Sequence, residues 1–82
     1  MDIDRYSIVE AAPSAEDYCR LRAESGLTPK TPEEARAAIA GGWLTVHAVE
    51  RDTDEVAGMA RVIGDGSWYF HICDVAVLPA HQ

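Results

Sequence analysis

Apolar and polar residues follow two different periods along this chain. Between residues 15 and 40 apolar residues recur three or four positions apart, which is typical of helices with one buried face. Over Trp43–Glu50 the period changes to two, with Leu44, Val46 and Ala48 alternating against Trp43, Thr45 and His47, which is typical of a strand with one buried face. Gly41-Gly42 separates the two patterns. The chain is therefore predicted to place its helices before most of its strands.

A short strand and a first helix are predicted near the start. Tyr6–Glu10 carries β-branched and aromatic residues and is closed by Pro13, which indicates a strand. Ser14 is a predicted N-cap with Asp17 three residues later, an approximate capping box. The helix is predicted over Ala15–Ser25, because Gly26 follows it.

The spacing of residues in this helix predicts which side is buried. Tyr18 and Leu21 fall on one face at helical spacing, and we expect them to pack inward. Arg20, Arg22 and Glu24 are expected to face outward.

A second helix and three strands are predicted in the remainder. Thr31 is the expected N-cap of the helix, Pro32 its first residue and Gly41-Gly42 its end. Charged and glycine-rich turns then separate three antiparallel strands, which Pro79 ends. These strands are predicted at Trp43–Glu50, Val56–Ile63 and Ser67–Val77.

The predicted order is a strand, two helices and a three-stranded antiparallel meander, which is an α+β fold with helices covering one sheet face. The 82 residues are enough for one domain, residues 1–82, without a linker or repeat. A chain this short buries a smaller share of its surface than an average domain, so its stability is expected to be small.

Charge narrows the classes of partner. Seven basic and fourteen acidic residues give a net charge of −7, with no basic cluster to neutralise a phosphate backbone, so nucleic acid is not an expected partner. This negative charge favours the approach of a cationic amine; the alternative is that it only keeps the protein soluble.

Metal and membrane sites are not expected either. Cys19 and Cys73 lack a Cys-x-x-Cys spacing and the three histidines are scattered, so we expect free thiols and no metal. No apolar run approaches about 18 residues, and the acidic start is unlike a signal peptide. A cytoplasmic protein with no membrane partner is predicted.

The end of the chain carries a motif. The strand-type run Val56–Val62 precedes Asp74–Pro79, an Ala-Val-x-Pro strand end that leads to Gln82. Together with the order of elements, this run resembles the N-terminal half of the GNAT superfamily of acetyl-CoA-dependent N-acetyltransferases, from its first to its fourth strand. The resemblance implies transfer of an acetyl group from acetyl-CoA to a primary amine of a small molecule or peptide.

The same resemblance implies a cofactor site. In that family, Gln/Arg-x-x-Gly-x-Gly/Ala forms a loop whose N–H groups hold the cofactor's pyrophosphate at a helix N-terminus. Gln82 would be the first residue of this motif. The backbone of Val75, Ala76 and Val77 would bind the pantetheine arm, while the alternative is that these are simply core residues of a buried strand.

Two residues are candidates for the general base. In the histone-acetylating branch of the family, a glutamate on the fourth strand lies five residues before the Ala-Val pair, and that position here is His71. A histidine suits proton transfer because its unperturbed pKa is about 6.5. Asp74 is the second catalytic candidate. The alternatives are a structural role for His71 and an ion pair between Asp74 and Arg61.

Two further segments concern the acceptor. Trp43 and the aromatic run Trp68–Phe70 are interpreted either as the lining of an acceptor pocket or as core packing. The loop between the helices, Gly26–Lys30, borders the acceptor site in the family.

Three hypotheses follow. The chain is a truncated acetyltransferase domain, inactive alone and weak in binding acetyl-CoA; a non-catalytic interaction module; or a remnant without activity. Because truncation would leave the strand Ser67–Val77 without a neighbour, this strand or the face beneath it is expected to contact a second copy, giving a homo-oligomer, most simply a dimer.

Overall fold

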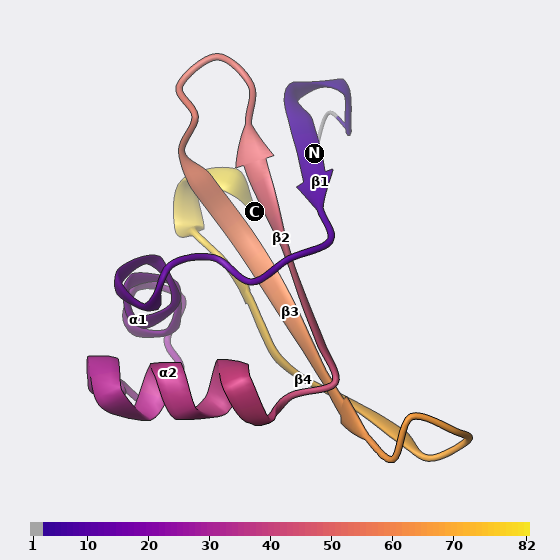
Figure 1. The fold of residues 1–82 in the computed structure, drawn as a ribbon. Coiled ribbons are helices and arrows are strands. Elements are labelled where there is room, and N and C mark those ends of the chain that lie inside the picture. Colours follow the sequence, from indigo (N-terminus) through magenta and orange to yellow (C-terminus); the bar gives the residue numbers. More distant parts are fainter. Residues whose placement is uncertain (1–2) are drawn as a thin grey trace.

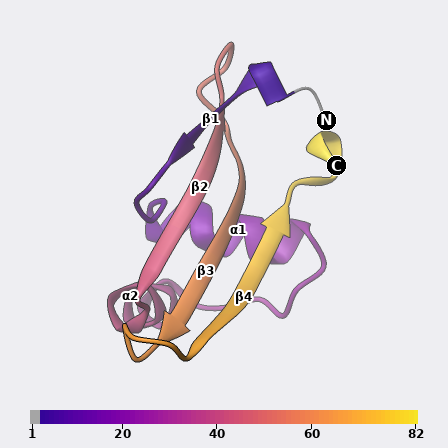
Figure 2. The ribbon, with the colours of Figure 1, turned by 90° about the vertical axis from the view of Figure 1, so that its right-hand side faces the viewer.

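Two helices lie on the same face of a four-stranded antiparallel sheet in the computed structural model, which describes residues 3–82 (Figure 1). The strands are ordered β1-β2-β3-β4, so β1 and β4 form the edges (Figure 2). This is the predicted α+β arrangement. The elements are η1 (Ile3–Arg5), β1 (Tyr6–Val9), α1 (Ala15–Glu24), α2 (Pro32–Gly41), β2 (Leu44–Glu50), β3 (Val56–Gly64), β4 (Phe70–Val77) and η2 (Pro79–His81).

Both helices begin at the predicted caps. The Ser14 hydroxyl accepts a hydrogen bond from the Asp17 N–H at 3.1 Å and starts α1. In α2, Thr31 and Glu34 form a complete capping box, in which each side chain accepts a hydrogen bond from the other's backbone N–H. Gly26, just after α1, has a φ of +90°, a conformation that favours glycine.

The core lies between the helices and the sheet. Tyr18 and Leu21 of α1 are almost fully buried, as predicted. They pack with residues from α2, β3, β4 and the segment after β4, namely Ala35, Met59, Ala76 and Leu78. The opposite face of the sheet carries no helix among the described residues (Figure 2).

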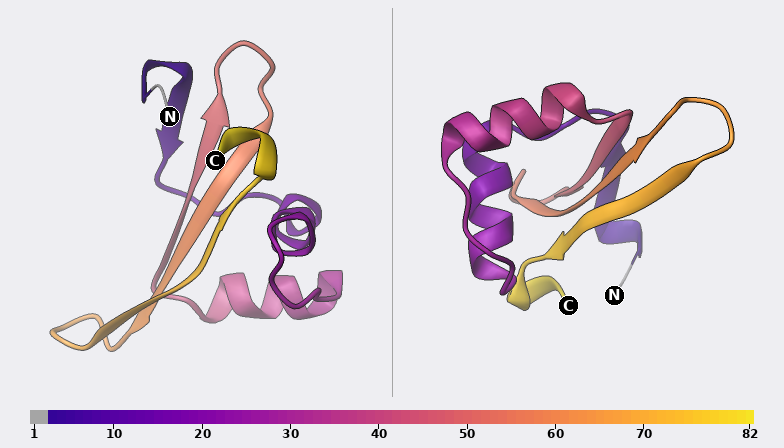
Figure 3. Two further views of the ribbon diagram at one scale, coloured as in Figure 1. Left: turned by 180° about the vertical axis from the view of Figure 1, so that it is seen from behind. Right: turned by 90° about the horizontal axis from the view of Figure 1, so that it is seen from below.

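The last strand is shorter than predicted. Residues 67–69 were expected in it, but β4 begins at Phe70 and the connection to β3 runs through residues 65–69. The Asp65 carboxylate accepts hydrogen bonds from the N–H groups of Ser67 and Tyr69, and Gly66 has a φ of +77°. An aspartate that binds the backbone two residues later stabilises a turn instead of a strand. The resulting hairpin extends beyond the helices (Figure 3).

Cys19 and Cys73 are both free, as predicted. Within residues 3–82, neither helix has the length and apolar character needed to cross a bilayer.

Candidate functional site

A β-bulge in the middle of β4 shapes the helix-covered side of the sheet. Met59 of β3 pairs with Ala76 and Arg61 pairs with Cys73, so Ala60 alone lies opposite two residues of β4. One of these two, Asp74, has a φ of +52°, a conformation that aspartate and asparagine adopt more readily than most residues. Strict alternation from Cys73 would direct the Asp74 side chain away from the helices. The bulge directs it beneath α1 instead.

The Asp74 carboxylate is the centre of a partly buried network. One oxygen, Oδ2, accepts hydrogen bonds from the Tyr18 hydroxyl and from Arg61 Nε, the latter at 2.7 Å. The other, Oδ1, accepts from Arg22 Nη1 at 2.5 Å. The Asp74 side chain is only 10% exposed. The ion pair between Asp74 and Arg61, which was one alternative for this residue, is therefore present.

The network changes the pKa of two groups. Burial alone raises the pKa of the Asp74 carboxyl, but the hydrogen bonds from Tyr18 and Arg61 and the two guanidinium charges outweigh it and hold that pKa below its usual value. Burial, followed by the hydrogen bond and charge of Asp74, raises the pKa of Tyr18 to about 12. At neutral pH, Asp74 is thus ionised and Tyr18 is protonated.

Arg22 was predicted to face outward, and this prediction was wrong. Its side chain is 11% exposed and lies beside Asp74, while its Nε donates to the Thr28 carbonyl at 2.8 Å. An arginine buries its methylene stem and needs an acid partner for its charge, and the bulge supplies one. Tyr18 and Arg22 were not predicted as site residues. Their spacing of four along α1 is the sequence signal that places them on one face.

A hollow of about 350 Å³ opens next to this network. Residues of α1, α2, β3, β4 and the loop between the helices line it: Tyr18, Arg22, Lys30, Glu34, Ala37, Ala38, Arg61 and Asp74. Arg61 also donates to the Ala38 carbonyl at 2.9 Å, which joins β3 to α2. The hollow therefore has charged walls at fixed positions.

His71 lies elsewhere. It is exposed near the start of β4, opposite Ile63, and lines a second hollow of about 370 Å³ with Tyr69 and Phe70. Asp74 does not line this second hollow. The two catalytic candidates are thus on one strand but in different sites.

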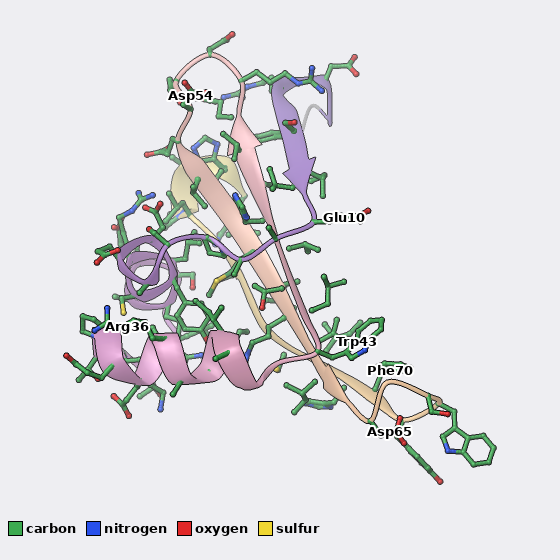
Figure 4. All side chains as sticks on the ribbon, in the orientation of Figure 1. Glu10, Arg36, Trp43, Asp54, Asp65 and Phe70 are labelled. Carbon is green, nitrogen blue, oxygen red and sulfur yellow. The ribbon has the colours of Figure 1, made fainter. Side chains whose placement is uncertain are left out.

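The aromatic residues of the hairpin are exposed, so their interpretation as core packing was wrong. Trp68 is 81% and Tyr69 73% exposed. Trp43 and Phe70 contact each other at the base of the hairpin, with ring centroids 4.8 Å apart (Figure 4). Only the last two of the run, Tyr69 and Phe70, line the hollow beside His71.

The predicted cofactor-binding segment, Val75, Ala76 and Val77, lies on the edge strand directly after Asp74. Ala76 is buried in the core and Val75 is 60% exposed. The Val77 carbonyl accepts a hydrogen bond from the Gln82 side chain at 2.9 Å, so one main-chain acceptor of the segment already has a partner.

A second polar cluster joins the ends of the chain. The Tyr6 hydroxyl and the Glu55 carboxylate each lie 2.7 Å from a different ring nitrogen of the buried His81. Glu55 in turn lies 3.6 Å from Arg20 of α1. Among the described residues, no group of three or more histidine, cysteine, aspartate and glutamate side chains is arranged to hold a metal ion.

Comparison with solved structures shows the family resemblance. A protein of unknown function from meticillin-resistant Staphylococcus aureus, described as a probable acetyltransferase, matches with a TM-score of 0.85 and 40% identity over 94% of this chain and 56% of its own. A GNAT-family acetyltransferase from Streptococcus pneumoniae matches with a TM-score of 0.74 and 27% identity over 94% and 55%. The chain has the fold of the N-terminal half of a GNAT domain.

This GNAT half spans just over half the length of the two structures. No protein-family profile matches the chain, and no curated protein does so significantly. The resemblance to GNAT acetyltransferases thus depends on structure, supported by identity to the first of the two proteins.

The Asp74 network predicts a pH-dependent loss of stability in Asp74→Asn. Asparagine tolerates the positive φ, so this change removes the charge without straining the bulge. At pH 7 the free energy of unfolding should fall by about 3 kcal/mol, because two partly buried arginines lose their counter-ion. The folded-state pKa is lowered, so the contribution is complete above the ordinary carboxyl value of about 4 and is lost as the pH falls through the lowered value.

Urea unfolding of both proteins from pH 7 to pH 3 measures this difference. It should shrink below about pH 4. Asp52→Asn, in the exposed β2–β3 loop, is the matched control and should leave stability nearly unchanged. A difference that stays constant with pH would contradict the assignment.

Proposed function

We propose that this chain forms the N-terminal half of an N-acetyltransferase domain that transfers the acetyl group of acetyl-CoA to a primary amine. The observation that carries the proposal is the similarity to the staphylococcal probable acetyltransferase, at 40% identity over 94% of this chain. We propose both the acyl donor, acetyl-CoA, and the acceptor, a primary amine.

The cofactor would bind along the open edge of the sheet. Val75, Ala76 and Val77 lie on β4, which has no further strand beside it among the described residues. An edge strand presents N–H and C=O groups along its outer side, and the amide groups of a pantetheine arm can bond to them as an added strand does. The Gln82 side chain on the Val77 carbonyl would then compete with the cofactor for that acceptor.

His71 is the better placed of the two candidates for general base. The Asp74 carboxylate already accepts three hydrogen bonds and has a lowered pKa, which makes it a weak base. His71 is exposed beside a hollow. It would take a proton from the incoming ammonium, so that the neutral amine attacks the thioester carbonyl. A C–N bond forms, the C–S bond breaks, and the departing CoA thiolate takes up the second proton that the nitrogen loses.

Self-association is a second candidate function, favoured by the exposed apolar residues of β4. Ile72 is 66% and Val75 60% exposed, and Phe70 and the tryptophan and tyrosine of the hairpin are exposed as well. An open edge strand with few charges can pair with another chain. Antiparallel pairing of β4 with β4 of a second copy would form a continuous sheet about a two-fold axis.

The cofactor proposal predicts weak binding localised to β4. Acetyl-CoA titrated into the isotopically labelled 82-residue chain should shift the backbone amide resonances of Val75–Val77, with a dissociation constant of about 1 mM, because only strand contacts are available in the described residues. AMP, which lacks the pantetheine arm, is the control and should leave these resonances unchanged. Micromolar affinity, or shifts confined to other segments, would contradict the prediction.

The general-base proposal predicts that His71→Ala lowers kcat at neutral pH by about 100-fold and raises KM by much less, since the base acts in the transition state. Release of CoA thiol by a completed domain that contains this chain, measured with a panel of primary amines from pH 6 to pH 9, tests this. His47→Ala is the control, because His47 binds the Ala11 carbonyl away from both hollows. An unchanged pH profile would assign His71 a structural role.

The pairing proposal predicts that the mass measured by light scattering rises with concentration in the micromolar range and that Val75→Lys prevents this rise. The lysine adds a charge to the open edge, which opposes strand pairing. Ser7→Lys places the same charge on β1, at the other edge, and should have no effect. A monomer at all concentrations for the unaltered chain would refute the idea.

A further inference from the structure

We propose that the hollow beneath α1 and α2 binds the carboxylate of a small molecule, through Arg22, Arg61 and Lys30. The further statement that this molecule is the acceptor amine rests on the proposed acetyl transfer. The binding of a carboxylate does not rest on it. At about 350 Å³ the hollow is at the lower end of the sizes typical of small-molecule sites.

The charge around this hollow is opposite to that of the whole chain. The chain has seven basic and fourteen acidic residues. Three of the basic ones, Arg22, Lys30 and Arg61, line the hollow, but only two of the acidic ones do, Glu34 and Asp74. A local excess of cations in a strongly acidic protein concentrates an anion at that point.

Hydrogen-bond donors remain available on each of the three cations. Arg22 uses Nε for the Thr28 carbonyl and Nη1 for Asp74. Arg61 uses Nε for Asp74 and Nη1 for the Ala38 carbonyl. Within residues 3–82, no hydrogen bond uses Nη2 of either arginine or the ammonium group of the exposed Lys30. A guanidinium held in place by two bonds is a pre-organised donor for a planar carboxylate.

The acids of the hollow, in contrast, offer little to a cation. All three hydrogen bonds accepted by Asp74 come from Tyr18 and the two arginines. One oxygen of Glu34 accepts from the Thr31 N–H in the capping box, and this bond lowers the Glu34 pKa. An ammonium group would therefore find both Asp74 oxygens and one Glu34 oxygen already bonded, whereas a carboxylate meets unused donors on all three cations.

The position of the hollow connects it with acetyl transfer. Lys30 and the carbonyl of Thr28 belong to the loop between α1 and α2, and Asp74 directly precedes the proposed cofactor-binding residues. An acceptor whose carboxylate lies here would have its amine near β4. The acceptor class that satisfies both the net charge and the local charge is therefore an amine that also carries a carboxylate, as amino acids do.

Titration of the labelled 82-residue chain with acetate tests the carboxylate site directly. Ionic strength is kept constant with chloride, since surface charge effects are screened by salt. We expect saturable shifts of the side-chain Nε–H resonances of Arg22 and Arg61 and of the Lys30 amide. Methylammonium should not shift them.

Two matched variants locate the effect. Lys30→Gln removes an exposed charge at the hollow and should weaken acetate binding about fivefold. Arg36→Gln removes a charge from the same helix pair, but Arg36 pairs with Glu33 and does not line the hollow, so binding should be unchanged.

Three results would overturn the proposal: equal effects of the two variants, shifts produced by methylammonium as readily as by acetate, or tighter binding of inorganic phosphate than of acetate. None of these measurements uses acetyl-CoA. Failure of acetyl-CoA to shift Val75–Val77 would contradict the proposed cofactor-binding segment and leave the carboxylate site intact, and failure of acetate would do the reverse.

Discussion

The helix-covered half of this molecule depends on one largely covered carboxylate. Asp74 joins β4 to Arg61 of β3 and to Tyr18 and Arg22 of α1, and these arginines in turn bind the α2 carbonyl of Ala38 and the loop carbonyl of Thr28. Two guanidinium groups so little exposed need a counter-ion, because an unpaired charge taken from water is costly. The network thereby determines how both helices lie on the sheet, in a chain too short to depend on a large core.

The same network divides the chemistry of β4 into two parts. Near the middle of the strand, two arginines balance the charge of the ionised Asp74 carboxylate and its pKa is lowered. Asp74 therefore orients the arginines and is poorly suited to take up protons. Toward the hairpin, His71 lies beside an open aromatic hollow. The two environments thus lie on a single strand, one at the bulge and the other before it.

The outer edge of β4 and its exposed face are apolar, unlike the charged hollow. Apolar side chains such as Ile72 and Val75 are exposed there, and the outer backbone groups have no strand beside them within the described residues. The chain therefore has a charged hollow on its helix-covered side and an apolar open edge at β4.

The sequence by itself determined the elements, because their signals are local. The caps Ser14 and Thr31 bind N–H groups three residues away, and the alternation of β2 is read within one strand. Its motif also pointed to the GNAT fold. The tertiary structure alone decided that Asp74 turns beneath α1, that Arg22 is largely covered beside it, and that the hairpin aromatics are exposed. The first two depend on a bulge and on helix packing between residues about 50 positions apart, such as Arg22 and Asp74. The third depends on a turn that Asp65 closes with the backbone of Ser67 and Tyr69. A period of two residues cannot show where one extra residue enters a strand.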